Sequence, residues 1–361
     1  MFSRSVGWEK LLHQVMCFIA PRQIGIIERA SAELGPDQVR VRTVASGVSA
    51  GTELTAYRGT NPYLTSTWNA DLHLFTDAHP DQPRYPLEGW GYSEVGVVTE
   101  VRVDAPIDDA DVRLGDVVWG IWGHRSEAVL PRAALRGHRL PDGMDPLTGC
   151  FVRVGAIALN AVLAAQCGIG DRVAIFGQGV IGLLATHFAL RSGASVIAVD
   201  GIGRRRDSAL AAGALAALSP GGDTALEIRR LTDGRGADVA IDLSGSYHAL
   251  REAIRAVGPD STVVAAGFYQ GPAEALALGE EFHHNRVRIV ASQIGAVPPH
   301  LYPRWDRDRL QHTVVGALAD KHPDVLGLIS HRFALADADQ AFQLLDQHPE
   351  QAMQVLLDFT S

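Results

Sequence analysis

The sequence predicts an α/β protein with two units, a β-rich unit followed by a doubly wound parallel sheet. Two observations predict this fold class. Between residues 37 and 145, short β-type runs such as "YSEVGVVTEVRV" and "GDVVWGIWG" are separated by Gly, Pro and Asp. From about residue 155 to 295, strand-type and helix-type patterns alternate, which is typical of a parallel sheet with helices on both faces.

These patterns place the boundaries of the segments at residues 154 and 297. Residues 1–154 are the expected β-rich unit and residues 155–297 the expected parallel-sheet unit. Residues 298–361 contain two helix patterns and two strand patterns, from "RLQHTVVGALADKH" to "QVLLDF". A chain of 361 residues is long enough for two domains with large buried cores.

Composition and charge argue against several kinds of partner. The chain is 47% hydrophobic and 20% charged, with a net charge of −9 and no basic stripe, so we expect no nucleic-acid partner. No apolar run reaches the roughly 18 residues that span a bilayer, and charged residues interrupt the start. We therefore expect a cytoplasmic location and no membrane partner. Cys17, Cys150 and Cys167 are far apart, which indicates neither a disulfide framework nor a thiolate zinc knuckle.

One stretch carries the signature of a dinucleotide-binding turn. Gly177, Gly179 and Gly182 form G-x-G-x-x-G after the strand pattern "VAIF" and at the head of an apolar helix. The first glycine allows the turn, the second lets the backbone approach a pyrophosphate, and the third lets the helix pack against the strand. At the helix N-terminus, Val180 and Ile181 accompany free N–H groups that face the phosphates. The motif predicts a Rossmann-type unit.

The end of the next strand indicates which dinucleotide binds. Asp200 stands there, where a carboxylate accepts both ribose hydroxyls and repels a 2′-phosphate, so we expect NAD. Arg204 and Arg205 leave NADP as the less favoured alternative, because an arginine can pair with a 2′-phosphate. Ser244 and Gly267 follow the next two strands, where small residues leave room for the nicotinamide half.

The whole arrangement resembles the medium-chain dehydrogenase/reductase superfamily, which includes the alcohol dehydrogenases. "SGVSAGTELTAYRG" resembles the family loop "G-I-C-G-T-D", "PLEGWGYSEVGVVTEV" resembles "P-x-x-x-G-H-E-x-x-G-x-V", and "RLGDVVWG" is similar to "GDRV". The resemblance implies a GroES-like catalytic domain, a Rossmann domain, and a C-terminal segment that returns to the catalytic domain. By resemblance we also expect a homodimer that pairs through the edge strand "RVRIVAS".

Three positions depart from the zinc-dependent members of this superfamily. The resemblance places Ala50 at the first cysteine ligand, Tyr92 at the histidine ligand and Arg153 near the third ligand. None of these side chains holds Zn²⁺ well. Many members also have a lobe whose cysteines bind a structural zinc. The corresponding residues of this chain, 100–116, contain no cysteine. We therefore expect no zinc in either place.

Without zinc, a hydrogen-bond donor or general acid must meet the charge that builds on a carbonyl oxygen during hydride transfer. The resemblance supplies Thr52, which matches the proton-passing hydroxyl of the family. We expect Tyr92 to point into the same cleft as donor or acid, or else to pack against the substrate. His124 is a third candidate because histidine titrates near neutral pH, although it could also only cap a strand. We expect Glu53 to be structural and paired with an arginine of the nucleotide domain.

The expected function is that of a zinc-independent NAD(P)-dependent oxidoreductase with a small-molecule substrate. The loop "G-V-S-A-G-T-E" resembles the branch that holds the bacteriochlorophyllide 3-hydroxyethyl dehydrogenase. This resemblance implies interconversion of a secondary alcohol and a ketone on a polyol, cyclitol, sugar or other secondary metabolite. We expect loops 60–86 and 297–310 to wall the substrate cleft, with aromatic residues such as Trp68, Tyr302 and Trp305. A zinc-independent C=C reductase of the enoyl or quinone type and a non-catalytic dinucleotide-binding protein are the alternatives.

Overall fold

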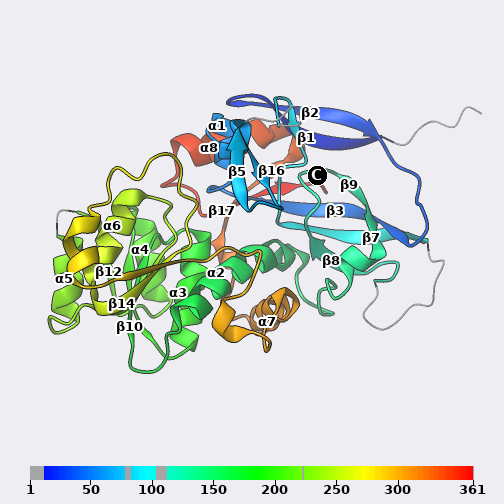
Figure 1. The fold of residues 1–361 in the computed structure, drawn as a ribbon. Helices are drawn as coiled ribbons and strands as arrows, with labels where there is room; N and C mark the ends of the chain where they lie inside the picture. Colours follow the sequence, from blue (N-terminus) through cyan, green and yellow to red (C-terminus); the bar gives the residue numbers. More distant parts are fainter. Residues whose placement is uncertain (1–11, 78–82, 103–111, 222, 361) are drawn as a thin grey trace, which may run out of the picture.

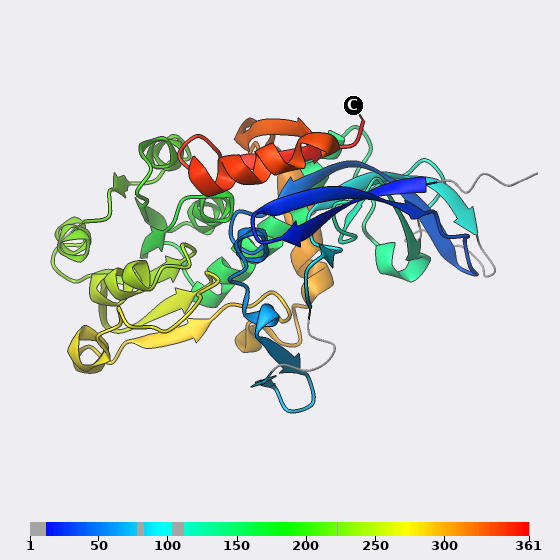
Figure 2. The ribbon, with the colours of Figure 1, turned by 90° about the horizontal axis from the view of Figure 1, so that it is seen from above.

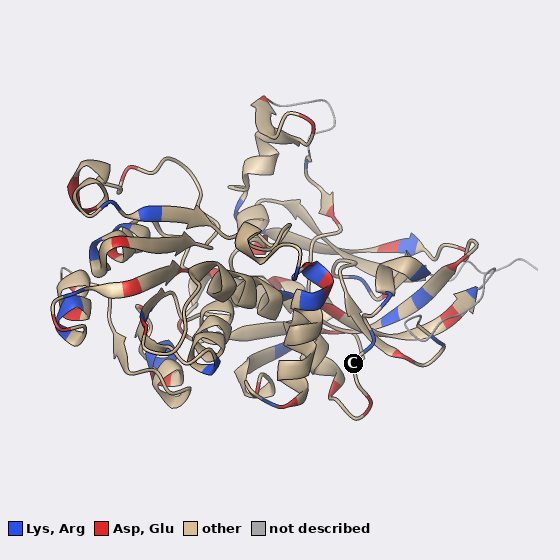
Figure 3. Ribbon diagram, turned by 60° about the horizontal axis from the view of Figure 1, so that its bottom comes forward, with Lys and Arg blue, Asp and Glu red and all other residues tan. Residues whose placement is uncertain are grey.

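The computed structural model describes residues 12–77, 83–102, 112–221 and 223–360. Two sheet-based units lie next to each other, a parallel-sheet unit in green and yellow and a β-rich unit in blue, cyan and red (Figure 1). The α/β class with a doubly wound sheet beside a β-rich unit is thus confirmed. Basic and acidic residues are interspersed over both units (Figure 3).

The parallel sheet has six strands in the order β12-β11-β10-β13-β14-β15. Its strands are β10 (Arg172–Phe176), β11 (Ser195–Val199), β12 (Ala216–Leu218), β13 (Ala237–Asp242), β14 (Val257–Ala265) and β15 (Arg288–Ala291). The chain leaves β10 toward one edge and later returns to its other side at β13. A doubly wound sheet binds its ligand at this switch point, outside the carboxyl ends of the strands.

Helices cover both faces of this sheet because the buried positions of its central strands are apolar on both sides. In β10, Val173 and Ile175 pack in the cluster that includes α2 and α3, whereas Ala174 and Phe176 pack in the cluster that includes α5 and α6. Successive side chains of a strand point to opposite faces, so a strand buried on both faces is apolar throughout. Over both units, the α-helices of the described residues are α1 (Glu53–Arg58), α2 (Val152–Ala165), α3 (Val180–Arg191), α4 (Gly203–Ala211), α5 (Thr224–Leu231), α6 (Tyr247–Ala256), α7 (Arg307–Ala319) and α8 (Ala338–Gln347).

The β-rich unit is built from both ends of the chain. Its larger sheet runs β16-β17-β3-β7-β8, with β9 also paired to β3, and its smaller sheet runs β2-β1-β6. The strands are β1 (Leu12–Ala20), β2 (Gln23–Ala30), β3 (Gln38–Val48), β6 (Leu87–Glu88), β7 (Glu94–Arg102), β8 (Val117–Gly120), β9 (Glu127–Pro131), β16 (Ile329–Ala334) and β17 (Gln354–Asp358). The late strand β17 pairs antiparallel with β3, and α8 packs against these strands (Figure 2).

One buried helix corrects the expectation that no run is long enough to span a membrane. Residues Pro146–Ala165 pass that test by length and composition, with a mean hydropathy of 1.8. However, 67% of this window is buried inside the protein, where α2 packs against α3, α7 and the parallel sheet. Its apolar composition therefore reflects its place in the core between the two units.

Candidate active site

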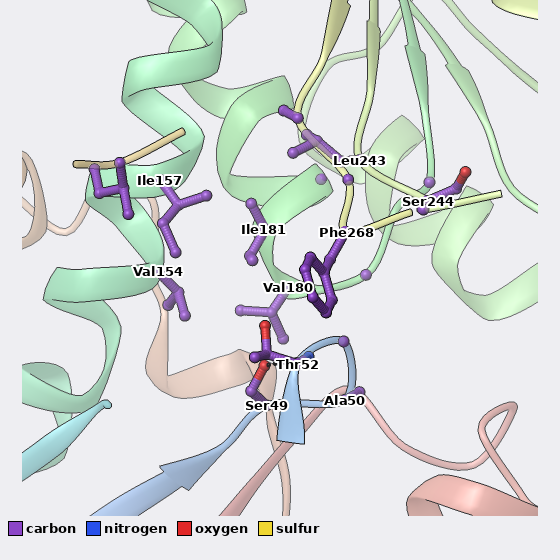
Figure 4. Close-up of a pocket in the computed structure, with 18 of the residues that line it drawn as sticks. Ser49, Ala50, Thr52, Val154, Ile157, Val180, Ile181, Leu243, Ser244 and Phe268 are labelled. Atoms are coloured by element: carbon purple, nitrogen blue, oxygen red, sulfur yellow. Dashed lines mark hydrogen bonds between the residues drawn. The ribbon is translucent and has the colours of Figure 1, made fainter. Parts of the chain in front are cut away.

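A cavity of about 830 Å³ lies where the two units meet, and both units line it. This volume is within the range of small-molecule and cofactor sites, roughly 300–1,000 Å³. The β-rich unit contributes the loop after β3 and the segment before β7, while the parallel sheet contributes the carboxyl ends of its strands. Figure 4 shows side chains from these elements converging on the cavity. The cavity therefore occupies the switch point at which doubly wound sheets bind ligands.

The glycine turn between β10 and α3 forms one wall of this cavity. Gly177, Gly179, Val180, Ile181 and Gly182 all line it. Gly177 has a φ of +85°, and a Cβ atom on Gly182 would lie only 1.8 Å from the carbonyl oxygen of Gly177. A Cβ atom on Gly179 would have its nearest neighbour 3.9 Å away, so the space beside this backbone is open. No side chain caps the start of α3, and this exposed N-terminus fits a diphosphate group.

Asp200 lines the same cavity just after β11 and is held by two backbone groups. Its Oδ2 accepts a hydrogen bond from the N–H of Gln178 at 2.7 Å, and its Oδ1 accepts one from the N–H of Ile202 at 2.8 Å. The side chain of Gln178 is in turn fixed, because its Oε1 accepts from Thr186 Oγ1 at 2.9 Å. These contacts hold the carboxylate at the end of the strand, beside the glycine turn.

The two predicted arginines differ in position, and both reach the C-terminal segment. Arg205 lines the cavity, with Nη1 3.9 Å from Oδ2 of Asp200, and its Nη2 donates to the carbonyl of Pro349 at 3.2 Å. Arg204 does not line the described cavity. Its Nη1 donates to the carbonyl of Gln351 at 3.1 Å. Both guanidinium groups thus link the parallel-sheet unit to the segment that leads into β17.

The other predicted cofactor residues, Ser244 and Gly267, also line the cavity. Asp242 fixes Ser244 in place. The backbone N–H and the Oγ of Ser244 both donate to Oδ1 of Asp242, at 2.8 and 2.6 Å. Burial raises the pKa of Asp242, and Tyr269 Oη donates to its Oδ2 at 2.7 Å. Asp242 is therefore a carboxylate that shapes the turn after β13. A second cavity of about 460 Å³ shares Gly177, Asp200 and Ser244 with the first.

On the side of the β-rich unit, the residues that line the cavity include Ser49, Thr52 and Tyr92, and we call their hydroxyl groups the hydroxyl cluster. Ser49 Oγ lies 2.6 Å from Tyr92 Oη. In Figure 4, Ser49 and Thr52 project from their loop toward Val180 at the start of α3. Their loop and the Tyr92 segment meet because β3 and β7 pair antiparallel at their ends.

The environment of Tyr92 favours its protonated form. Burial raises the pKa of its hydroxyl, and the charge of Glu53 raises it further, while hydrogen bonds from Ser49 and Thr52 and the charge of Arg153 act in the opposite direction. The sequence pattern named Thr52 and Tyr92, which both line the cavity, and did not indicate Ser49. The available signal was a second hydroxyl residue three positions before Thr52 in the same loop.

His124 lies behind the cavity and does not line it, which corrects its predicted role at the reacting atoms. It is 1% exposed, and its Nε2 is 2.7 Å from Oε2 of Glu53. The prediction for Glu53 is therefore also corrected, because its partner is His124 of its own unit and no arginine of the nucleotide domain. A loop histidine next to a strand is fully buried here because its ring nitrogen has a hydrogen-bond partner in the carboxylate of Glu53.

The residues at the zinc-ligand positions do not fit Zn²⁺. Ala50 offers no donor atom, the raised pKa of Tyr92 keeps its hydroxyl in the protonated form that binds Zn²⁺ poorly, and Arg153 is a cation. Among the described residues, no group of three or more His, Cys, Asp and Glu side chains is arranged to hold a metal ion. Residues 103–111, in the predicted place of the missing structural lobe, lie outside the described part.

The predicted aromatic walls are elsewhere. Trp68 lies on the hairpin of β4 (Ser66–Asn69) and β5 (Leu74–Asp77), where it contacts Phe75 with ring centroids 5.2 Å apart. Trp305 is covered by the guanidinium of Arg309, 4.4 Å from its ring centroid. Neither of these tryptophans lines a described cavity, nor does Tyr302, and residues 78–82 of the first loop lie outside the described residues. Instead, the apolar wall comes from Val154, Ile157, Phe268 and Ile294.

Comparisons with known proteins agree with this architecture. A family model described as zinc-binding dehydrogenase matches residues 180–307. The D-guloside 3-dehydrogenase of Escherichia coli (strain K12) is 32% identical over 345 residues, which cover 94% of this chain and 98% of that protein. The structure of galactitol-1-phosphate dehydrogenase from Escherichia coli superposes with a TM-score of 0.76 at 20% identity, over 96% of this chain and 99% of that chain. The same values hold for 2R,3R-butanediol dehydrogenase from Bacillus subtilis. The chain therefore belongs to the medium-chain dehydrogenase/reductase superfamily and is one of its dehydrogenases.

Proposed function

We propose that this protein is a zinc-independent, NAD-dependent dehydrogenase that interconverts a secondary alcohol and a ketone on a sugar or polyol. The observation that carries the proposal is the hydroxyl cluster, which faces the glycine turn across one cavity. The relative that is 32% identical is a D-guloside 3-dehydrogenase, and the similar folds include a galactitol-1-phosphate dehydrogenase. These names support a carbohydrate or polyol as the substrate class.

The cofactor site supports NAD over NADP. Asp200 presents a carboxylate at the end of β11, where it would accept the ribose hydroxyls and repel a 2′-phosphate. Arg204 and Arg205 donate to backbone carbonyls of the segment before β17, so neither guanidinium is reserved for a phosphate. The glycine turn would hold the diphosphate. The second cavity, which continues past Asp200, would hold the adenosine half.

In this proposal, a bound nicotinamide supplies or accepts the hydride. The Tyr92 hydroxyl, which burial keeps protonated, donates a hydrogen bond to the substrate oxygen and gives it the proton when a ketone is reduced. Ser49 fixes the direction of that hydroxyl at 2.6 Å, and Thr52 passes the proton between the cluster and solvent. The apolar wall of Val154 and Ile157 excludes water around the reacting carbon.

Zinc independence rests on the donor chemistry at the three ligand positions. The matched family model carries zinc in its description, but its residues 180–307 include none of Ala50, Tyr92 and Arg153. We also propose a homodimer and a cytoplasmic location. Support for the dimer is the outer edge of β15, which pairs only with β14 among the described strands and exposes Ile289 and Val290.

The test is turnover by metal-stripped protein on a panel of sugars, polyols and glycosides, with NAD⁺ or NADP⁺, followed by the absorbance of the reduced nicotinamide. We expect turnover with NAD⁺ that added Zn²⁺ does not raise. Tyr92→Phe should lower kcat by about 10²- to 10⁴-fold, as the loss of a general acid does. Tyr302→Phe, at an exposed tyrosine outside the cavities, is the matched control.

Three outcomes would contradict the proposal. Activity that disappears on chelation and returns with Zn²⁺ would establish a metal mechanism. Reduction of an α,β-unsaturated ketone with NADPH, without alcohol oxidation, would establish a C=C reductase. Tight NADH binding without turnover of any substrate in the panel would favour a non-catalytic nucleotide-binding protein.

A further inference from the structure

A buried network of four polar side chains lies behind the hydroxyl cluster, and we call it the His124 network. His124 Nε2 is 2.7 Å from Oε2 of Glu53, and His124 Nδ1 is 2.6 Å from Ser46 Oγ. Ser46 Oγ also donates to Oε1 of Glu94 at 3.0 Å. Ser46, Glu53 and Glu94 are 0% exposed and His124 is 1% exposed. The network is therefore continuous and sealed from solvent.

Glu53 and Glu94, the two ends of the His124 network, are each close in sequence to one residue of the hydroxyl cluster. Glu53 directly follows Thr52 and opens α1, and its backbone N–H donates to the carbonyl of Ser49 at 3.2 Å. Glu94 opens β7, two residues after Tyr92. A single imidazole thus connects the segments that carry the hydroxyl cluster.

Backbone pairing places Ser46, another member of the network, where the end of β3 meets the start of β7. Ser46 lies on β3 opposite Glu94, three residues before Ser49. The next residue, Gly47, donates its N–H to the carbonyl of Ser93 at 2.8 Å. The end of β3 and the start of β7 are therefore joined by backbone hydrogen bonds and by the network together.

We propose that His124 is a positioning residue for the reaction, held as an imidazolium between Glu53 and Glu94, and that it sets the geometry of the hydroxyl cluster. This inference deepens the proposed function and rests on it. A shift of about 1 Å in a reacting group lowers rates by about 100-fold, so the placement of the cluster has kinetic consequences.

With Glu53 and Glu94 both ionised, the hydrogen-bond directions require the charged form of His124. Ser46 has one hydroxyl proton and donates it to Glu94, so Nδ1 of His124 must donate to Ser46 Oγ. Nε2 must donate to the carboxylate of Glu53, and an imidazole that donates from both nitrogens is an imidazolium. Glu53 Oε1 has no hydrogen-bond partner among the described residues, so this buried carboxylate needs the adjacent cation.

The surroundings of His124 are consistent with this form. Burial lowers the pKa of His124, but the charges of Glu53 and Glu94 outweigh burial and raise it overall. Glu53 approaches from α1 and Glu94 from β7, while Ser46 of β3 and the ring of Phe342 on α8 are the uncharged neighbours. Burial in turn raises the pKa of Glu94, which His124 opposes.

The first experiment does not depend on turnover. Imidazole ¹⁵N chemical shifts are measured by NMR in protein labelled at histidine, with the His124 signals assigned by their loss in His124→Asn. We expect both ring nitrogens to be protonated at neutral pH and to remain so above the pH at which free histidine titrates. Shifts of a neutral imidazole at pH 7 would overturn the inference even if the enzyme is active.

The second experiment separates positioning from folding. His124→Asn and Ser46→Ala are compared with His138→Asn, a control at a histidine of the same unit that stacks on Trp119 at a centroid distance of 3.9 Å. We expect the two network variants to lower kcat about 10- to 100-fold while the affinity for NADH stays unchanged, because the cofactor binds mainly to the other unit. The control should keep the wild-type kcat.

The pH profile of kcat adds a readout that a structural role alone would not move. The charge of Glu53 raises the pKa of Tyr92, so Glu53→Gln should move the alkaline limb of the profile to lower pH. A folded His124→Asn or Ser46→Ala variant with wild-type kcat, or a Glu53→Gln variant with an unchanged profile, would overturn the inference. If His124→Asn does not fold, Ser46→Ala and Glu53→Gln decide the question. If the wild type turns over no substrate, the proposed function fails and the NMR result still decides the state of His124.

Discussion

Replacing Gly182 by alanine tests the most sharply defined contact of the cofactor site. The added Cβ atom would lie 1.8 Å from the carbonyl oxygen of Gly177 and 2.7 Å from its carbonyl carbon, whereas real Cβ atoms do not come within 3.0 Å. The start of α3 must therefore move away from the turn by at least about 1.2 Å, the difference between 3.0 and 1.8 Å. Because the obstacle is backbone, no side-chain rotation relieves it.

Two separate losses follow from that displacement. Overpacking of this kind costs about 1–3 kcal/mol, so Gly182→Ala should lower the melting temperature by several degrees. The N–H groups that face the diphosphate would also be displaced, and the loss of a hydrogen bond to a charged group costs about 1.5–3 kcal/mol. We therefore expect the Kd for NADH to rise about 10- to 100-fold, measured by fluorescence titration.

Two alanine variants at other glycines serve as controls. At Gly179 the nearest atom to an added Cβ is 3.9 Å away, and its φ of −66° and ψ of −171° suit any residue. Gly179→Ala should keep the wild-type melting temperature and still weaken NADH binding, because its methyl group occupies the place of the pyrophosphate. In Gly316→Ala on α7, no atom lies within 4 Å of the added Cβ. This variant should lower neither the melting temperature nor the affinity for NADH. Wild-type NADH affinity in Gly179→Ala would refute a diphosphate site at this turn.

Two further predictions concern charge. Asp200→Asn removes the carboxylate that accepts the ribose hydroxyls and repels a 2′-phosphate. It should weaken NADH binding and reduce the preference for NADH over NADPH by about 10-fold, measured as the ratio of the two Kd values. An unchanged ratio would contradict the role of Asp200. The raised pKa of His124 predicts that its contribution to stability is complete below its unfolded value of about 6.5 and is lost as the pH rises through the folded value. Thermal unfolding across neutral to alkaline pH should show stability falling by up to about 1.4 kcal/mol per pH unit, and His124→Asn should flatten this slope.

The parts of the fold that the sequence predicts correctly are those with a local physical cause. β10 is apolar at every buried position because helices cover both of its faces, and this pattern is visible without any neighbour. The glycines of the turn are equally readable, because Gly182 has no room for a side chain and Gly177 needs a positive φ. Asp200 ends a strand and so falls at the carboxyl edge of the sheet. Each of these features depends on neighbours within about one βαβ unit.

The corrections concern contacts between segments that are far apart in the chain. His124 and Glu53 are 71 residues apart and form a buried pair, and Arg204 reaches a carbonyl 147 residues further on. No periodic pattern in the sequence predicts a contact between residues this far apart in the chain. The prediction that Trp68 and Trp305 wall the cavity was wrong for the same reason. Aromatic residues in a loop indicate that the loop makes contacts, but they do not indicate which part of the protein it contacts.

The three changed zinc-ligand positions have a common physical meaning. A metal ion at this site would supply positive charge near the reacting oxygen and lower the pKa of a bound hydroxyl. In the proposed mechanism Tyr92 provides the hydroxyl itself, and Arg153 provides a positive charge that acts on the pKa of Tyr92 in the same direction as a metal would. Glu53 acts in the opposite direction, but its charge is partly balanced by His124. Burial is the main cause of the raised pKa of Tyr92, and the balance between Arg153 and the Glu53–His124 pair adjusts how readily Tyr92 releases its proton. Neutralising Arg153 should consequently move the alkaline limb of the activity profile to higher pH, opposite to the shift expected for Glu53→Gln.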